Sequence, residues 1–297
     1  MKKFGLIGHP IAHSLSPALF KAGYDGRYPY DLIESDDFET AYDRFLKEYD
    51  GINVTAPFKE LALQKADIIS EECKAVGATN LLIKTPDGIT AYNSDCRGLI
   101  LWLSSVVLGY KSVLPPWPQG QASDQQTAQW AFAASFAPDK GRQGFFCTPT
   151  PQMITEVLIV GYGGAGKAAA AAARSLGMNV TILNRTCKED GIKPLKEFRS
   201  EFRKADIVIY NLPMRIAELD MLTEEDCTPG QQKVILEANY RNPAFDRELL
   251  EKIQNWNPLV KYEEGQTWLL MQAITGYELF TGEAPDAEKM LSVIKSK

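Results

Sequence analysis

The sequence predicts an α/β protein built on a mostly parallel sheet. Two observations lead to this fold class. Short apolar segments of strand length alternate with helical segments along most of the 297 residues, and a glycine-rich turn joins a strand to an alanine-rich helix within residues 156–186. Such alternation is typical of parallel sheets covered by helices. The length allows one large domain or two ordinary ones.

The first hundred residues alternate strands with helices. Phe4–Gly8 is expected to be a buried strand, and Ser16-Pro17 to open a helix with Ser16 as N-cap and Pro17 at its first position. The next elements are the strands Tyr30–Glu34 and Gly51–Val54, a helix over Pro57–Asp67 opened by Thr55, a hairpin of Thr79–Lys84 and Ile89–Ala91, and a helix that Ser94 or Asp95 caps and that ends near Ser105.

Residues 106–155 interrupt this pattern. They are rich in Gln, Pro and Ser, include several aromatics, and are long for a connection within a compact domain. We interpret 105–155 as an atypical insertion, with Ser123–Phe136 consistent with one helix. A peripheral role is favoured over a binding lid. Beyond it we expect the strands Glu156–Val160, Asn179–Leu183, Ala205–Asn211 and Val234–Ala238, and the helices Leu249–Ile253, Thr267–Phe280 and Asp286–Ile294.

The glycine turn fits the dinucleotide-binding pattern G-x-G-x-x-G. Gly161, Gly163 and Gly166 occupy its three positions between a strand and a helix, the context that makes this motif credible. The first glycine permits a tight turn, the second lets the backbone approach a pyrophosphate, and the third allows close helix–strand packing. With Gly164 and Ala165, they present free N–H groups and the positive end of the helix to the phosphates.

The end of the following strand indicates which dinucleotide is bound. An NAD site usually has Asp or Glu there, bonded to the ribose 2′-hydroxyl, whereas this chain has Asn184, Arg185 and Thr186. Arg185 can pair with a 2′-phosphate through a charge-assisted fork, and Asn184 and Thr186 can donate hydrogen bonds. The sequence therefore predicts an NADP site. The alternative is a Rossmann unit without a cofactor and with a solvated Arg185.

The composition argues against nucleic acid or a membrane as partner. The net charge is −6 and the sequence pI is near 5.2, opposite to the basic balance that those partners select. The five cysteines are scattered without a C-x-x-C pair, as in reduced cytosolic proteins. The two histidines, His9 and His13, have no cysteine beside them, so no metal site is expected. We expect a cytoplasmic protein.

Polar side chains follow or end the expected strands of the first hundred residues. In an open α/β sheet, ligands bind outside the carboxyl ends of strands, and hydroxyl and amide groups suit a small polyhydroxylated acid. The candidates are Ser14, Ser16, Asn53, Thr55, Lys59, Asn80 and Asp95. Lys59 and Asp95 form the pair able to move a proton, because hydride transfer to a carbonyl leaves an alkoxide that an oriented lysine can protonate. Taken singly, a solvated lysine and helix N-caps are the plainer interpretations.

Motifs spread over most of the chain resemble one enzyme family. In order, they are GHPIAHSLSP, GINVTAPFKE, VGATN, YNSD, GYGGAG, NRT, EANYRNP and EGQTWLLMQ. This series resembles the shikimate dehydrogenases, NADP-dependent enzymes that reduce 3-dehydroshikimate to shikimate. The resemblance implies a substrate domain over 1–104, completed by C-terminal helices in 263–297, and a doubly wound, Rossmann-like NADP domain over 156–262. It also implies a cleft between the two domains that can close.

The resemblance also assigns roles to individual residues. It implies that Lys59 is the catalytic lysine and Asp95 its carboxylate partner. Ser14 and Ser16 would bind the substrate carboxylate. The remaining substrate-binding residues would be Asn53, Thr55, Asn80, Asp95 and Gln272 on the ring hydroxyls, and Tyr240 lining the cleft.

Several positions depart from the family pattern. Leu81 stands where threonine is usual, Cys96 where glycine is usual, and Glu237 where aspartate is usual. The run Asn211-Leu212-Pro213-Met214 lacks the hydroxyl expected beside the nicotinamide, and the insertion replaces a short link. These departures bear on the choice of substrate and on the nicotinamide end of the site.

Two other functions remain open at this stage. Quinate or an amino analogue of shikimate could be the substrate, or the protein could be a non-catalytic NADP- or ligand-binding regulator on the same fold. Retention of Lys59 and Asp95 argues against a regulator, which has no need of a lysine–carboxylate pair. We expect a small-molecule partner only, and a monomer or homodimer.

Overall fold

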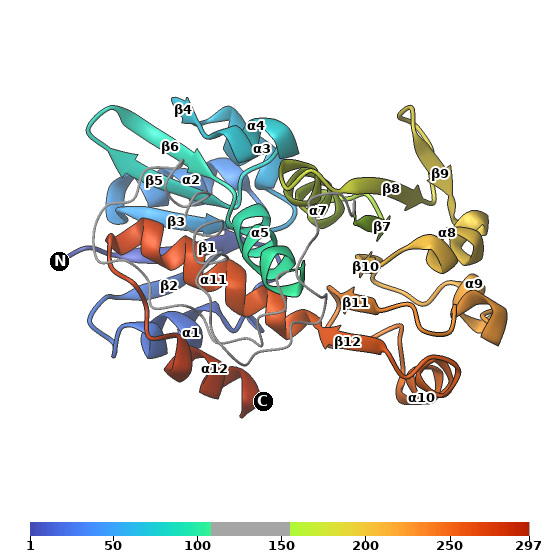
Figure 1. Cartoon of the computed structure of the whole chain (residues 1–297). Helices are drawn as coiled ribbons and strands as arrows, with labels where there is room; N and C mark the ends of the chain where they lie inside the picture. The colour runs from blue at the N-terminus through green and yellow to red at the C-terminus, as the bar shows by residue number, and fades with distance from the viewer. Residues whose placement is uncertain (108–154, 297) are drawn as a thin grey trace. The chain divides into compact units, whose positions relative to one another are not determined.

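The computed structural model describes residues 1–107 and 155–296, which form two compact units with one six-stranded sheet each (Figure 1). The first unit contains residues 1–98 and 269–296, and the second contains residues 99–107 and 155–268. The division falls within the helices α5 (Ser94–Val107) and α11 (Gly265–Thr281). The domain limits expected from the sequence remain predictions. Most of the insertion, including Ser123–Phe136 where a helix is expected, lies outside the described residues.

The first unit combines parallel and antiparallel strands in the order β2-β1-β3-β5-β6-β4. Its elements are β1 (Phe4–Gly8), α1 (Ser16–Gly23), β2 (Tyr30–Glu34), α2 (Phe38–Glu48), β3 (Gly51–Val54), α3 (Lys59–Gln64), β4 (Ile68–Ile69), α4 (Glu71–Val76), β5 (Leu81–Thr85), β6 (Gly88–Tyr92) and α12 (Ala287–Lys295), with the adjoining parts of α5 and α11. Strand β5 is antiparallel to both neighbours, β3 and β6, whereas β1 is parallel to β2 and β3. The carboxyl ends of β1, β3 and β6 therefore meet the amino end of β5 at one edge.

Both faces of this sheet are buried under helices. Successive strand residues point to opposite faces, so neighbouring residues of one strand pack against different helices. Leu81 and Ile83 pack with α1, α11 and α12, while Leu82 between them packs with α2, α3 and α4. Helices thus cover the sheet on both sides, as is typical of largely parallel sheets. This explains the near-continuous apolar runs of the strands.

The second unit is a fully parallel, doubly wound sheet, in agreement with the predicted fold class. Its elements are β7 (Glu156–Val160), α7 (Gly164–Ser175), β8 (Asn179–Asn184), β9 (Ile192–Pro194), α8 (Phe198–Lys204), β10 (Ile207–Tyr210), α9 (Ala217–Asp220), β11 (Lys233–Glu237), α10 (Arg247–Trp256) and β12 (Val260–Glu264), with short 3₁₀ turns at Leu195–Glu197 and Glu224–Asp226. The strand order is β12-β11-β10-β7-β8-β9. The chain reverses direction across the sheet between β7 and β10, and ligands bind at such a switch point.

Three expected helix starts are wrong. Helix α1 begins at Ser16 itself, whose side chain makes no capping bond and instead contacts Ser14. Helix α3 is shorter than Pro57–Asp67, because a turn closed by the Phe58 N–H on the Thr55 carbonyl (3.0 Å) precedes it. At α5, Asn93 is the cap, since its side chain accepts the Cys96 N–H at 3.0 Å.

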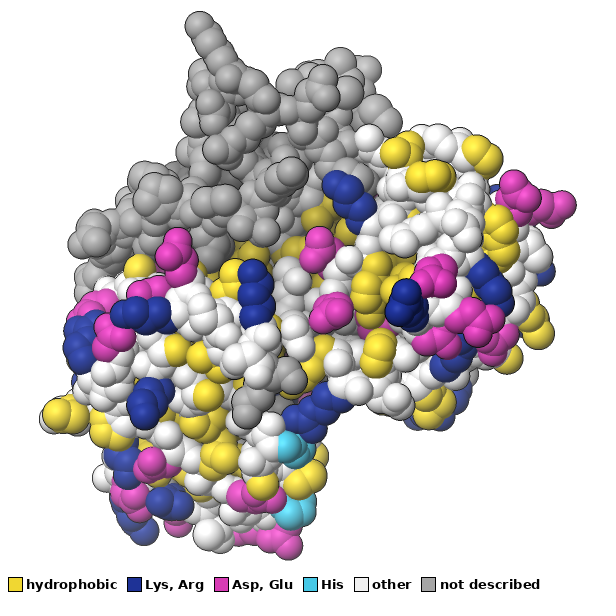
Figure 2. All heavy atoms as spheres, turned by 90° about the horizontal axis from the view of Figure 1, so that it is seen from below, with side chains coloured by type: hydrophobic (Ala, Val, Ile, Leu, Met, Phe, Trp, Pro, Cys, Tyr) yellow, Lys and Arg dark blue, Asp and Glu magenta, His cyan; other side chains and the backbone are white. Residues whose placement is uncertain are grey.

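On the face drawn in Figure 2, basic and acidic side chains are interspersed rather than separated into patches of one sign. The chain's two histidines, drawn in cyan, lie at this surface. Among the residues that the structure describes, no helix has the length and apolar character needed to cross a membrane.

A lysine is fully buried at the start of β11. Lys233 has no exposed surface, and its Nζ donates to the carbonyls of Phe202 (2.7 Å) and Ala205 while lying 4.8 Å from the Phe202 ring centre. Burial lowers its pKa from 10.5 to about 8. Lys233 thus ties the end of α8 to β11, and it does so in a site that disfavours its charge.

We expect Lys233 to make the stability of the protein rise with pH. Between its folded pKa of about 8 and its unfolded value of 10.5, the unfolded chain holds a proton that the folded chain lacks, so stability increases with pH in this window. The free energy of unfolding of the native protein minus that of Lys233→Met should grow by roughly 1–2 kcal/mol between about pH 7.5 and about pH 9.5. Urea denaturation of both proteins measures this difference.

The raised pKa values of the buried thiols Cys73 and Cys96 act with the opposite sign, because the folded state retains their protons longer. They are common to both proteins and cancel in the difference. A difference that stays constant over this pH range would show that Lys233 is not held in the disfavoured environment described here.

Candidate active site

Lys59 and Asp95 are in contact at the edge of the first sheet where the carboxyl ends of β3 and β6 meet the amino end of β5. We call this edge, with its hydroxyl and amide side chains, the polar edge. Lys59 opens α3 after the turn that follows β3, and Asp95 lies in the first turn of α5 after β6. Their Nζ and Oδ2 atoms are 2.6 Å apart, and the side chains retain 25% and 17% of their exposure. The pair is therefore held firmly but remains accessible to a small molecule.

Asn80, Ser94 and Gln272 form a hydrogen-bonded chain next to this pair. The Asn80 Oδ1 accepts the Ser94 N–H at 2.7 Å, and its Nδ2 donates to the Ser94 Oγ at 3.0 Å. The Ser94 Oγ donates to the Gln272 Oε1 at 3.2 Å. Sequence reasoning treated Ser94 only as a helix cap, although its place between Asn93 and Asp95 in a polar segment was a signal for a larger role.

Two glycines let α5 and α11 approach closely enough for this contact. A Cβ on Gly98 would lie 2.5 Å from the Gln272 backbone nitrogen, and a Cβ on Gly276 would lie 2.9 Å from the Ser94 Oγ. Both distances are below any normal contact. Backbone contact between the helices therefore brings Gln272 to the edge where Ser94 lies.

Asn53 extends the polar chain toward β2. The Tyr30 hydroxyl donates to the Asn53 Oδ1 at 2.8 Å, and the Asn53 Nδ2 donates to the Asn80 carbonyl at 3.3 Å. Thr55 follows on the same segment and is partly buried. Burial raises the pKa of Tyr30 well above its usual value, so its hydroxyl stays a neutral donor. No pattern in the sequence signals this role for Tyr30.

Ser14 and Ser16 face each other after β1. Their Oγ atoms are 3.2 Å apart, and the Ser14 Oγ also accepts the Ser16 N–H at 3.2 Å. The Tyr277 hydroxyl donates to the Ser16 carbonyl at 3.1 Å and so connects this segment to α11, which also carries Gln272. Both serines are partly exposed. Tyr277 is not predicted from the sequence, because its contact with the Ser16 segment depends on how α11 is rotated about its own axis.

The glycine turn of the second unit has the geometry that its motif requires. Gly161 has a φ of +93°, which favours glycine, and a Cβ there would lie 2.9 Å from Leu212. A Cβ on Gly166 would collide with the Gly161 carbonyl oxygen. Gly163 and Gly164 instead have open space where a Cβ would stand, and α7 begins there without an acidic residue in its first turn. This leaves its N-terminal N–H groups suited to an anion.

Asn184 ends β8, and its amide forms hydrogen bonds with neighbouring segments. The Asn184 Oδ1 accepts the Tyr162 N–H at 3.3 Å, and its Nδ2 donates to the Thr186 carbonyl at 3.1 Å. Its amide therefore holds the glycine turn against this segment. Arg185 and Thr186 are exposed, and Arg185 forms no ion pair with any described residue. Arg185 is thus the group best able to meet a phosphate.

Asn211 carries an unsatisfied polar atom at the switch point. It follows β10, its N–H donates to the Val160 carbonyl of β7 at 2.7 Å, and its Nδ2 donates to the Ile209 carbonyl at 3.3 Å. Its Oδ1 is buried without a partner among the described residues. A buried acceptor in this state calls for a donor from elsewhere. With the open glycine turn beside β7, this fits a bound dinucleotide.

Glu237 fixes the loop that carries Tyr240. This buried carboxylate accepts the backbone N–H groups of Ala244 and Phe245 (3.1 Å for Phe245) and the Tyr262 hydroxyl (3.0 Å). Burial raises its pKa. Tyr240 lies in the loop that these bonds close, between β11 and α10, and is partly buried. Both carboxylate oxygens of Glu237, which stands where the family has aspartate, therefore accept hydrogen bonds.

Comparisons with known proteins agree with these two sites. A family described as the shikimate dehydrogenase substrate binding domain matches residues 6–82, and the NAD binding domain of the D-isomer specific 2-hydroxyacid dehydrogenases matches residues 136–254. The chain is 26% identical to a shikimate dehydrogenase (NADP(+)) of Bacillus subtilis over 321 aligned positions, covering 100% of this chain and 98% of the relative.

Solved structures show the same fold over the full length. A shikimate 5-dehydrogenase from Thermus thermophilus, in complex with NADP(H) and shikimate, aligns with a TM-score of 0.67 at 24% identity, covering 100% of this chain and 99% of that one. A quinate dehydrogenase from Corynebacterium glutamicum in complex with NAD aligns with a TM-score of 0.71 at 20% identity, with the same coverage. In its substrate-domain match, its full-length relative and its ordered motifs, the chain is thus similar to the shikimate dehydrogenase family, and the solved structures share its fold.

Proposed function

We propose that the protein is an NADP-dependent shikimate dehydrogenase, which interconverts 3-dehydroshikimate and shikimate. The observation that carries the proposal is the contact of Lys59 with Asp95 (2.6 Å) at an edge lined by hydroxyl and amide side chains. The B. subtilis relative, a shikimate dehydrogenase (NADP(+)) that aligns over the full chain, supports both the substrate and the cofactor.

The substrate is a small acid with several hydroxyls, and the polar edge suits it. We assign the substrate carboxylate to the hydroxyls of Ser14 and Ser16, which already point toward each other. The amides of Asn53, Asn80 and Gln272, with Thr55, would bind the ring hydroxyls. The amides are held by Tyr30 and Ser94, so their orientation is set before the substrate binds. Such preorganisation lowers the entropic cost of binding.

Lys59 is assigned the proton transfer. NADPH, when bound, would supply a hydride for the substrate carbonyl carbon, and the carbonyl oxygen would then need a proton. The Lys59 ammonium can donate that proton, and in the reverse direction its amine can accept the proton of the hydroxyl. Asp95 keeps the lysine side chain in place through the short contact and can also accept a hydrogen bond from a substrate hydroxyl.

The cofactor is assigned to the carboxyl edge of the second sheet. Gly161, Gly163, Gly164, Ala165 and Gly166 form the turn and helix start suited to the pyrophosphate. Arg185 would pair with the 2′-phosphate beside Asn184 and Thr186. Tyr240 would line the cleft as a substrate-binding residue. The unpartnered Asn211 Oδ1 is available for a donor of the bound cofactor.

The test is an assay with a panel of substrates and cofactors. Purified protein should produce reduced nicotinamide, followed by absorbance, from shikimate with NADP. We expect quinate to be oxidised more slowly, because its extra ring hydroxyl and saturated ring place different demands on Asn53, Asn80 and Gln272. Faster turnover of quinate would assign the protein to quinate instead. NADP binding without turnover of either substrate would favour a regulator.

We further propose that the enzyme acts in the cytoplasm as a monomer or homodimer. The described cysteines, Cys73, Cys96, Cys187 and Cys227, are all free thiols, as is typical of a reducing compartment.

A further inference from the structure

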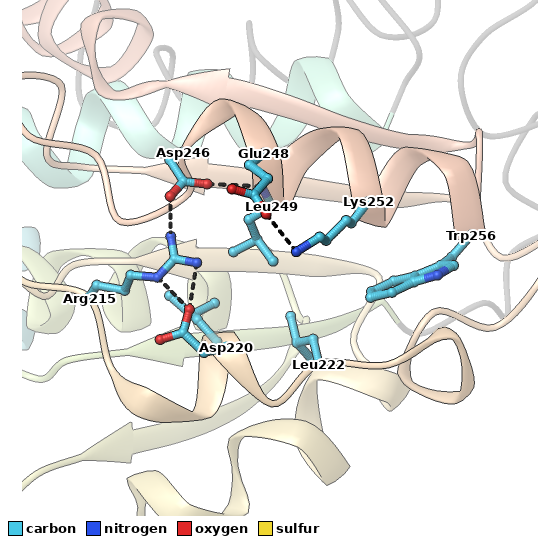
Figure 3. Close-up of a pocket in the computed structure, with 9 residues that line it drawn as sticks. Arg215, Asp220, Leu222, Asp246, Glu248, Leu249, Lys252 and Trp256 are labelled. Atoms are coloured by element: carbon cyan, nitrogen blue, oxygen red, sulfur yellow. Dashed lines mark hydrogen bonds and ion pairs between the residues drawn. The ribbon is translucent and has the colours of Figure 1, made fainter.

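One arginine joins the two loops that follow β10 and β11. Arg215 lies on the first of them, residues 211–216. Its Nε and Nη2 donate to the Asp220 Oδ1 (2.9 and 2.7 Å), and its Nη1 donates to the Asp246 Oδ2 (2.9 Å) (Figure 3). The Nη1 also donates to the Ala244 carbonyl (2.7 Å). Ala244 and Asp246 belong to the second loop, residues 238–246. A single planar guanidinium therefore crosslinks the two loops.

The second loop is braced internally as well. The Asn239 Nδ2 donates to the Asn242 carbonyl (2.8 Å) and, across to the first loop, to the Pro213 carbonyl (3.4 Å). The Asn239 Oδ1 accepts the backbone N–H groups of Arg241 and Asn242, both at 3.3 Å. With Glu237 fixing the end of this loop, Arg215 and Asn239 set its position relative to residues 211–216.

Arg215 also lines a cavity of about 460 Å³ between α9 and α10, whose far end is formed by Leu222 and Trp256 (Figure 3). The charged side chains of its wall are paired with one another. Arg215 is paired with Asp220 and Asp246, and Lys252 with Glu248 at 2.8 Å. Because these charges already have partners, the cavity offers a ligand no free charge, and the polar end of the cavity serves to connect the loops.

The two crosslinked loops carry one residue assigned to the nicotinamide end of the cofactor and one assigned to the substrate. Asn211, with its unpartnered Oδ1, begins the first loop, and Tyr240 lies in the second. We propose that Arg215 is a positioning residue that fixes Asn211 and Tyr240 relative to each other for hydride transfer. This inference rests on the proposed function. Arg215 acts through the Ala244 carbonyl, Asp220 and Asp246.

A lysine could not take this role. The acceptors of Arg215 lie on three different residues, and the rigid fork of a guanidinium reaches them together. A lysine ammonium is a point charge on a flexible stem and would hold one or two of them. Arg215→Lys therefore keeps the charge and tests the geometry, while Arg215→Gln removes both.

The matched control is Arg247→Gln. Arg247 is the first residue of α10, its side chain is 93% exposed, and its partner is Glu251 on the same helix. The control makes the same change of charge near the second loop without touching the crosslink. We expect native kinetics from it.

For Arg215→Gln we expect turnover to fall by at least about tenfold, since small misplacements of reacting groups cost up to about 100-fold. The KM for shikimate should change less than turnover, because all of the assigned substrate residues except Tyr240 lie in the first unit. With shikimate deuterated at the carbon that gives up the hydride, the isotope effect on turnover should increase. A purely structural loss of active protein would leave that isotope effect unchanged.

A second measurement needs no cofactor. Amide hydrogen exchange of peptides covering 211–216 and 238–246 should be faster in Arg215→Gln and Arg215→Lys than in the native protein and in Arg247→Gln. The positioning role would be overturned if both Arg215 variants showed the same amide hydrogen exchange rates and the same isotope effect as the native protein. If Arg215→Gln fails to fold, Arg215→Lys alone decides. An inactive native protein overturns the proposed function and the positioning role with it, even if exchange shows that the crosslink exists.

Discussion

Replacing Lys59 with alanine should lower turnover by about 10²–10⁴-fold, the usual contribution of a general acid–base group. The KM for shikimate should change little, because the hydroxyl and amide groups that we assign to binding are held by Tyr30 and Ser94 rather than by Lys59. Steady-state kinetics with shikimate and NADP measure both parameters.

The control for this variant is Lys65→Ala. Lys65 lies at the end of the same short helix, is also paired with a carboxylate (Glu39, 2.8 Å), and is more exposed than Lys59. It should behave as the native protein. A small primary amine added to the assay should restore part of the rate to Lys59→Ala and none to Lys65→Ala. Near-native turnover of Lys59→Ala would show that another group moves the proton.

Asp95→Asn separates the two roles assigned to the carboxylate. An amide cannot neutralise the lysine, so Lys59 loses its fixed position and turnover falls. The substrate hydroxyl also loses a charged acceptor, and hydrogen bonds to charged groups contribute about 1.5–3 kcal/mol. We therefore expect KM to rise as well, in contrast to Lys59→Ala.

The order of strands and the glycine turn could be predicted from the sequence because each depends on local chemistry. A run such as Glu156–Val160 followed by G-x-G-x-x-G leaves few other structures, and the structure confirms the strand and turn. Helix boundaries were less predictable. Ser16 resembles an N-cap, but its hydroxyl contacts the Ser14 hydroxyl instead of a backbone N–H of the helix. Which of these two partners the hydroxyl contacts depends on tertiary packing.

Helix α2 is not among the predicted elements, although the sequence contains its signal. Helix α2 places Phe38, Ala41, Tyr42 and Phe45 on one buried face, and Asp37 caps it by accepting the Thr40 N–H. This is the spacing of an amphipathic helix. The two-residue strand β4 has no comparable signal, because only its partner β6 defines it.

The residues of the polar edge could be predicted from the sequence, but the hydrogen bonds that hold them could not. The sequence places Asn53 and Asp95 near the carboxyl ends of β3 and β6, which are parallel to each other, and ligands bind at such ends. Asn80 reaches the same edge because it precedes β5, which is antiparallel to both. The sequence does not reveal that Tyr30 and Ser94 hold these side chains, since those contacts join residues 23 and 14 positions apart through the packing of the sheet and helices. Asn184 shows the same limit. Its role at the phosphate stays a prediction, and the sequence gives no sign that its amide also bonds Tyr162 and Thr186.

The protein should prefer NADP to NAD by at least about tenfold in kcat/KM, and Arg185 should carry most of that preference. A hydrogen bond to a charged group contributes about 1.5–3 kcal/mol, and 1.4 kcal/mol is about tenfold in affinity. Arg185 is exposed, so the lower end of this range applies. Arg185→Ala should weaken NADP by about tenfold and leave NAD unchanged, because NAD lacks the phosphate that the guanidinium would bind.

Asn184→Asp should reverse the preference with little disturbance to the fold. Its side-chain oxygen accepts the Tyr162 N–H, and a carboxylate oxygen can accept the same bond. The exchange loses only the donation to the Thr186 carbonyl and adds a negative charge beside the expected phosphate site. That charge repels a 2′-phosphate and can accept a bond from the ribose hydroxyl of NAD. Measuring kcat/KM for NAD and NADP in the native protein and in the two variants tests both the cofactor preference and its dependence on these residues. Equal use of NAD and NADP by the native protein would disprove the phosphate clamp at Arg185, while the assignment of Lys59 and Asp95 to proton transfer would still stand on its own kinetics.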